Sequence, residues 1–176
     1  MTDSILIGCG AGFSGDRIDA AQAVVKTLIQ RKQKSVLMFE MLAERTLALG
    51  QLAKNQNPEL GYEPLLEDIL TPIIKDCVDH QIPIVSNFGA ANPIAAGKLI
   101  LRIAKAQGID NLKVAVVQGD DILNSVDLSK LEVWEGDVEL AVSAGEPIAA
   151  NVYLGAKAIA DALSQGAQVV VTGRVA

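Results

Sequence analysis

The stretch ILIGCGAGFSGDR, from Ile5 to Arg17, predicts the first strand of the fold, the turn after it and the start of the first helix. Its opening residues, Ile5–Ile7, are apolar and predict a strand, while Arg17–Gln30 carries apolar residues at helical spacing. The glycines of Gly10–Gly15 between them allow a tight turn. A strand, a turn and a helix in this order are typical of a parallel sheet connected by crossover helices.

The same alternation continues along the chain. Further strands are expected at Ser35–Phe39, Ile82–Val85, Leu112–Val117 and Gln168–Val171, and further helices at Ala43–Ala53, Leu65–Asp79, Pro93–Ala106 and Ile148–Ser164. Pro72 is expected to interrupt or kink its helix, and the less regular Asp120–Pro147 predicts a short excursion over the sheet. The pattern predicts an α/β fold with a mostly parallel, doubly wound sheet; part of a β/α barrel is the alternative.

Composition narrows the class of protein. The 176 residues are 50% hydrophobic and 3% aromatic, which suits one α/β domain over residues 1–176 with a sizeable core. The net charge of -6 argues against a nucleic-acid surface, although backbone N–H groups can still bind an anion locally. The sequence shows no signal peptide and no apolar run of about 20 residues, so a cytoplasmic protein with no membrane partner is expected.

The last residues, Val171–Ala176, follow an apolar run that predicts an internal strand, with no helix after it to cover it. We therefore expect a truncated or split part of a longer domain. Association with the missing part, or a homo-oligomer that buries the strand, would supply the cover.

Small or polar residues follow every predicted strand. In parallel sheets, ligands bind at the carboxyl ends of the strands, so these residues are expected to meet at one edge. The candidates are Gly10, Gly12, Phe13, Asp16 and Arg17 after the first strand, Glu40, Glu44 and Arg45 after the second, Asn87, Gly89 and Asn92 after the third, Asp120 and Asp121 after the fourth, and Thr172 and Arg174 after the fifth.

Gly10–Gly15 also matches the G-x-G-x-x-G fingerprint of dinucleotide-binding proteins, and Glu40 could bind a ribose. However, Glu40 lies farther along than the roughly 20 residues of the usual spacing, and Asp16 and Arg17 follow the third glycine directly. We favour another anionic or polar ligand over NAD or NADP. A purely structural turn is the third interpretation, and the cofactor stays unknown.

Carboxylates supply the candidate catalytic residues Glu40, Glu44 and Asp120, since a positioned carboxylate can take or give a proton. Helix capping is an alternative for Glu44, and a metal contact, a ribose contact or an N-cap for Asp120 with Asp121. Glu40 and Glu44 with Arg45 nearby could alternatively hold a metal, but we predict no metal site, because a single histidine gives no conventional His-based cluster. That histidine, His80, precedes the third strand at the opposite end of the sheet, which argues against a catalytic role. Cys9 is expected to pack in the core or the turn.

Amides and one arginine are the candidate substrate-binding groups. Asn87 and Asn92 could orient a carbonyl by neutral hydrogen bonds, although an N-cap before Pro93 by itself explains Asn92. Arg174 could anchor a carboxylate or phosphate, or be solvated near the chain end.

Several ordered motifs resemble the acyclic terpene utilisation (AtuA-type) family. They are Gly10–Arg17, Phe39–Thr46, Asn87–Pro93, Gly119–Asp121, Asn151–Ala156 and Thr172–Ala176. Members are usually longer, so the chain resembles the amino-terminal part. The resemblance adds Asn151 to the predicted substrate-binding residues. It implies a link to the breakdown of acyclic terpenoids through acyl-CoA thioesters.

These observations together predict an enzyme domain that binds a small acidic or acyl-CoA-type substrate at the carboxyl ends of the strands. Lyase or hydratase chemistry is favoured over redox chemistry. An NAD- or NADP-dependent oxidoreductase and a non-catalytic metabolite-binding or assembly module are the alternatives.

Overall fold

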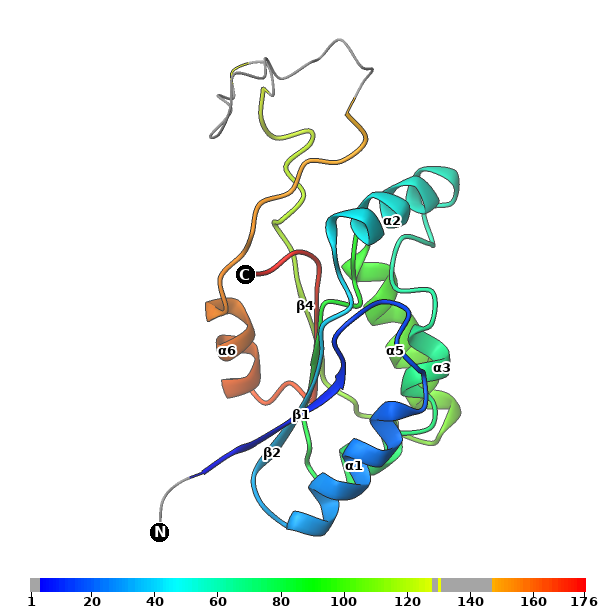
Figure 1. Cartoon of the computed structure of the whole chain (residues 1–176), viewed down its shortest axis with the longest axis vertical. Coiled ribbons are helices and arrows are strands. Elements are labelled where there is room, and N and C mark those ends of the chain that lie inside the picture. Colours follow the sequence, from blue (N-terminus) through cyan, green and yellow to red (C-terminus); the bar gives the residue numbers. More distant parts are fainter. Residues whose placement is uncertain (1–3, 128–129, 131–146) are drawn as a thin grey trace.

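A parallel sheet of five strands forms the centre of the molecule. The computed structural model describes residues 4–127, 130 and 147–176 (Figure 1). The strands are β1 (Leu6–Ala11), β2 (Ser35–Phe39), β3 (Ile84–Ser86), β4 (Val114–Val117) and β5 (Val169–Thr172), in the order β1-β2-β3-β5-β4. Every pairing is parallel, which confirms the predicted α/β class.

Six helices connect or flank these strands. They are α1 (Ala20–Arg31), α2 (Glu44–Gln56), α3 (Leu66–Leu70), α4 (Ile74–Asp79), α5 (Pro93–Ala106) and α6 (Lys157–Ser164) in the described part of the chain. Because β5 lies between β3 and β4, the chain reverses direction along the sheet once. Figure 1 accordingly shows α6 on one side of the sheet and α1, α3 and α5 on the other, as in a doubly wound fold.

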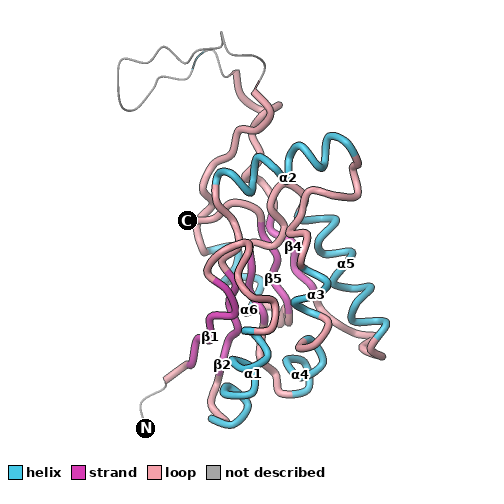
Figure 2. The backbone as a smooth tube through the Cα atoms, turned by 45° about the vertical axis from the view of Figure 1, so that its right-hand side comes forward, coloured by secondary structure: helices cyan, strands magenta, loops and turns pink. Residues whose placement is uncertain are grey.

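The main core lies between the sheet and the helices α1, α3, α4 and α5. All four residues of β5 are buried, since β3 and β4 flank it on both sides. This confirms the prediction that the last apolar run is an internal strand. In Figure 2 the strands are magenta, and α3 and α5 lie to their right. Buried side chains from strands and helices fill this layer, among them Leu37, Ile84, Val171, Ile74 and Ile100.

The opposite face of the sheet is open at β1 and β2. Gly8 faces α1, because a Cβ there would meet Val24 and Leu28, so by alternation Ile7 and Cys9 face away from α1. Ile7 is 68% exposed, and Met38 on β2 is 36% exposed. The prediction that Cys9 packs in the core or the turn is therefore wrong, because this face carries no helix there (Figure 1).

Several element boundaries differ from the sequence prediction. Strand β1 extends to Ala11, and the glycines within it fit because α1 and the Phe39 ring leave no room for side chains. Pro72 separates α3 from α4, as predicted. The helix expected from Ile148 begins only at Lys157, because the preceding backbone forms bridges at Asn151 and Leu154 instead.

The excursion predicted at Asp120–Pro147 lies mostly outside the described residues. Within the described ranges, no helix is long and apolar enough to cross a membrane.

Candidate functional site

A cavity of about 420 Å³, here called the rim cavity, opens at the carboxyl ends of β2, β3 and β5. Four predicted site residues line it: Glu40, Asn87, Thr172 and Arg174. Two further polar residues in the wall are Ser86 and Tyr153. The apolar part of the wall consists of Met38, Phe39, Val85, Ile159, Val175 and Ala176. These four residues, Glu40, Asn87, Thr172 and Arg174, therefore lie together at the carboxyl ends of the strands, as the sequence predicted.

Glu40 is held through one carboxylate oxygen. Its Oε1 accepts hydrogen bonds from Asn87 Nδ2 at 2.9 Å and from the backbone N–H of Leu42 at 3.1 Å. Asn87 is fixed in turn, because its Oδ1 accepts the backbone N–H of Met41 at 2.7 Å. The second oxygen, Oε2, has no hydrogen-bond partner among the described residues. Glu40 directly follows the last residue of β2 and is exposed.

Arg174 joins three segments at the strand ends. Its Nη1 donates to the carbonyl of Leu42 at 2.8 Å, and its Nη2 donates to the Tyr153 hydroxyl at 2.7 Å and to Glu44 Oε1 at 3.3 Å. The guanidinium carbon also lies 4.1 Å from the centre of the Tyr153 ring. Its Nε has no partner among the described residues, so the guanidinium keeps an unused donor beside the rim cavity.

Glu44 stands at the start of α2 and lines a neighbouring cavity of about 300 Å³, which shares Tyr153 and Arg174 with the rim cavity. The pKa of its carboxyl is lowered, first by a hydrogen bond from its own backbone N–H, then by the Tyr153 hydroxyl and the Arg174 charge. The ionised form is thus favoured, which suits a base or a charge partner better than an acid. Asn151 lines the same neighbouring cavity.

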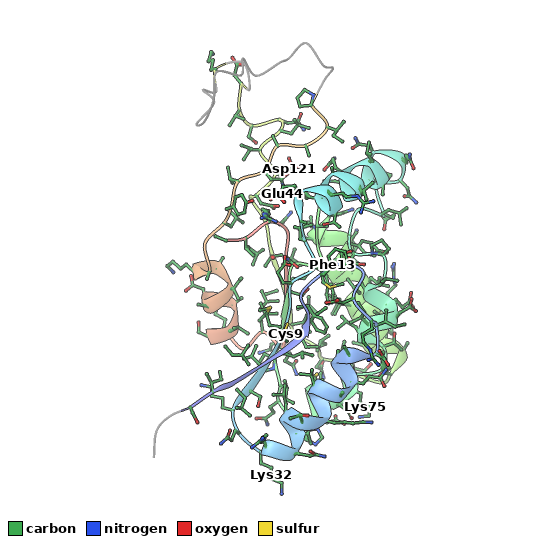
Figure 3. All side chains as sticks on the ribbon, viewed as in Figure 1. Cys9, Phe13, Lys32, Glu44, Lys75 and Asp121 are labelled. Atoms are coloured by element: carbon green, nitrogen blue, oxygen red, sulfur yellow. The ribbon has the colours of Figure 1, made fainter. Side chains whose placement is uncertain are left out.

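Asp120 is only 4% exposed, and its carboxylate forms hydrogen bonds with the neighbouring loops. Its Oδ2 accepts the backbone N–H of Arg174 at 2.7 Å and Asn151 Nδ2 at 3.1 Å. The neighbouring Asp121 is exposed, accepts the backbone N–H of Leu123 and lies 3.9 Å from Lys54 Nζ. Figure 3 labels Asp121 and Glu44 near each other at this end of the molecule. Asp120 therefore positions the loop that carries Arg174.

The glycine loop folds on itself. Gly12 N–H donates to Asp16 Oδ2 at 2.9 Å, so a carboxylate of the chain already occupies one of the backbone donors expected to face an anion. Gly10 is buried against the Phe39 ring, which a Cβ at this position would overlap. Phe13, 57% exposed, covers Gly15. None of the five predicted loop residues lines either cavity at the rim.

Two predicted arginines point elsewhere. Arg17 forms an exposed ion pair with Asp19 at 2.6 Å, and that contact raises the pKa of the guanidinium and lowers the pKa of the Asp19 carboxyl. Arg45 is exposed and makes no hydrogen bond or ion pair with a described residue. Neither residue lies in the wall of the rim cavity.

The turn after β3 carries two more predicted site residues, Gly89 and Asn92, and both make contacts within the fold. Gly89 donates its N–H to the carbonyl of Thr172 at 2.9 Å, and a Cβ at Gly89 would overlap Pro93. Asn92 caps α5 by accepting the N–H of Ala95 at 3.3 Å. Its Nδ2 also donates to the carbonyls of Pro58 and Leu60. Its amide is thus occupied by the fold rather than directed at a ligand.

A third cavity, of about 320 Å³, lies at the amino ends of β3 and β5, where Cys77, Ile82 and Val169 line it. It contains no charged side chain. Ligands of parallel sheets bind at the carboxyl ends, and the predicted polar residues gather there, so the rim cavity is the better candidate. In the described part of the chain, no three His, Cys, Asp or Glu side chains form a group that could hold a metal ion.

Comparison with known proteins agrees with the motifs at these strand ends. The model of the family described as "Acyclic terpene utilisation family protein AtuA" matches residues 5–176. The chain belongs to the AtuA family. Searches of curated proteins and of solved structures returned no match. The AtuA motifs quoted above include most residues of the rim cavity, from Phe39 and Glu40 to Tyr153 and Arg174.

Sequence reasoning about this AtuA chain missed three polar residues. Tyr153 lies inside a quoted family motif, so a polar aromatic residue within that motif was the available signal. Ser14 of the glycine loop donates a hydrogen bond of 2.7 Å to Glu63, which lies before α3. Nothing in the local sequence pairs two residues that are so far apart in the chain, and only the fold brings them together.

Proposed function

We propose that this AtuA-family chain binds a small carboxylic acid or acyl-CoA-type substrate in the rim cavity, where Glu40 transfers a proton. The observation that carries the proposal is the carboxylate of Glu40. One of its oxygens is fixed by Asn87 and the Leu42 N–H, and the other has no partner among the described residues. A proton-transfer group needs this combination of a fixed position and a free oxygen.

The rest of the cavity supports a substrate with an apolar body and one polar end. Met38, Val85 and Ile159 supply apolar surface, and the Nε of Arg174 offers a donor for a carboxylate or a thioester carbonyl. Glu44 accepts a bond from the same guanidinium at 3.3 Å and balances part of its charge. This balance favours a carbonyl, or a singly charged acid, over a phosphate at that point.

Removal of a proton from the carbon next to a carbonyl suits such a site. Glu40 takes the proton, the electron pair moves toward the carbonyl, and donors near the carbonyl oxygen stabilise the charge that develops. A hydroxyl on the neighbouring carbon then leaves as water together with the proton that Glu40 took, which is lyase chemistry. Hydratase chemistry is the reverse: water adds to that carbon of an unsaturated substrate, and a proton is delivered to the carbon next to the carbonyl. The family's description, acyclic terpene utilisation, fits a substrate with an apolar chain.

Hydrogen exchange tests the proposal directly. Butyryl-CoA is incubated with the protein in D₂O, and loss of its α-proton NMR signal is followed. Exchange should occur with the wild type and fall by about 10²-fold or more in Glu40→Gln. Glu67→Gln, an exposed substitution on α3, is the control and should leave exchange unchanged.

The proposal would be contradicted if no exchange occurred and calorimetry showed no binding of butyryl-CoA. Exchange that persists in Glu40→Gln would remove Glu40 from it. The same calorimetry with NAD and NADP tests the oxidoreductase alternative based on Gly10–Gly15.

A further inference from the structure

A separate cavity of about 140 Å³ lies between α2 and the loops that hold Ser14, Glu63 and Asn87; we refer to it as the Glu63 cavity. Its volume is close to the roughly 150 Å³ of an engineered protein cavity that binds benzene, so it fits about six non-hydrogen atoms. Most of its wall is apolar or small, from Met41, Leu42, Leu49, Ala53, Pro64 and Ala90. Asn87 lines this cavity and the rim cavity.

The polar end of the Glu63 cavity is a buried carboxylate. Glu63 is only 5% exposed, and it accepts the Ser14 hydroxyl at 2.7 Å and the backbone N–H of Leu65 at 3.1 Å. Among the described residues, no lysine, arginine or histidine nitrogen lies within 4.0 Å of this carboxylate. A buried charge without a counter-ion is costly, so the site favours a cation.

Ser14 strengthens this preference. A hydroxyl has a single hydrogen to donate, and Ser14 gives it to Glu63. Its oxygen can therefore only accept a further hydrogen bond. The Ser14 hydroxyl and the Glu63 carboxylate can therefore each accept a hydrogen bond from a ligand, and the carboxylate repels anions.

We infer that the Glu63 cavity binds a small primary ammonium compound with an apolar body, such as a short alkylammonium. The ammonium donates to Glu63 and to the Ser14 oxygen, and the alkyl chain lies against Leu49 and Ala53. This site is distinct from the rim cavity and takes a ligand of opposite charge.

Calorimetry with n-butylammonium, n-butanol and butyrate at neutral pH tests the inference, because the three probes are alike in size and differ in charge. Wild type should bind n-butylammonium saturably, n-butanol more weakly and butyrate not at all. Glu63→Gln should weaken the binding of n-butylammonium by about tenfold or more. Ala53→Phe should abolish binding by filling the cavity, and the exposed Glu59→Gln should change nothing.

Three results would overturn the inference: no saturable binding of n-butylammonium to wild type, equal binding of butyrate, or ammonium binding that survives both Glu63→Gln and Ala53→Phe. Circular dichroism checks that the variants fold. If Glu63→Gln does not fold, amide NMR of the wild type decides the matter. Shifts centred on Ser14, Gly50 and Tyr62 on adding n-butylammonium support the site, and shifts centred elsewhere contradict it.

Discussion

The carboxylate of Asp120 accepts the backbone N–H of Arg174 at 2.7 Å, which joins the loop after β4 to the loop after β5. Asp120 is buried, and Asn151 shares the same oxygen. Asp120→Ala would leave the half-buried N–H of Arg174 and the Asn151 amide without their acceptor. We expect a loss of about 1–3 kcal/mol in the free energy of unfolding, measured with urea.

The adjacent Asp121→Ala is the matched control, since Asp121 is exposed. Its effect should stay within about 0.5 kcal/mol. Equal effects of the two substitutions would show that the bond between Asp120 and Arg174 contributes nothing measurable.

Tyr153 is predicted to hold down the pKa of Glu44. Its hydroxyl donates to Glu44 Oε1 at 2.9 Å and is the second of the causes that lower this pKa. In Tyr153→Phe the pKa of Glu44, followed by carbon-13 NMR, should rise toward the ordinary glutamate value. The rise should be partial, because the backbone N–H of Glu44 is the larger cause and stays in place. An unchanged pKa would contradict the contact.

The sign of the Glu44 effect on stability follows from the direction of the shift. Because the folded-state pKa is lowered, the ionised carboxylate stabilises the fold above the pH range in which unfolded glutamate titrates. This contribution is lost as the pH falls through the lower folded pKa. Urea unfolding should therefore separate wild type from Glu44→Gln at neutral pH and bring them together in acid. A difference that stays constant with pH would argue against the linkage.

Gly10 and Gly12 should respond differently to a methyl group. A Cβ at Gly10 overlaps the buried Phe39 ring, whereas a Cβ at Gly12 meets nothing within 4 Å. Gly10→Ala should lower the free energy of unfolding by about 1–3 kcal/mol, and Gly12→Ala should change it by less than about 0.5 kcal/mol. Urea unfolding measures both. If Gly10→Ala were tolerated as well as Gly12→Ala, packing would not explain the first glycine of the fingerprint.

The sequence predicted the sheet better than it predicted the site. Apolar runs such as Ser35–Phe39 have the correct period and length, so the order of strands and helices followed from local pattern. The site depends on contacts between distant residues. Asn92 and Gly89 look like binding groups in the sequence, yet contacts with Pro58, Leu60 and Thr172 occupy them. The pair of half-buried Ser14 and buried Glu63 left no local signal, because tertiary packing alone creates it.

The two cysteines should differ sharply in reactivity. Cys77 is buried in α4, and burial, together with the nearby Asp76 charge, raises the pKa of its thiol to about 12. At pH 8 this thiol stays almost wholly protonated and shielded, and the thiolate is the reactive form. Cys9 lies exposed on the open face of β1 (Figure 3). Ellman's reagent should therefore label one thiol of the native protein quickly and the second only on unfolding. Cys9→Ser should abolish the fast phase and Cys77→Ser should preserve it; a fast phase that persists in Cys9→Ser would place Cys77 within reach of solvent.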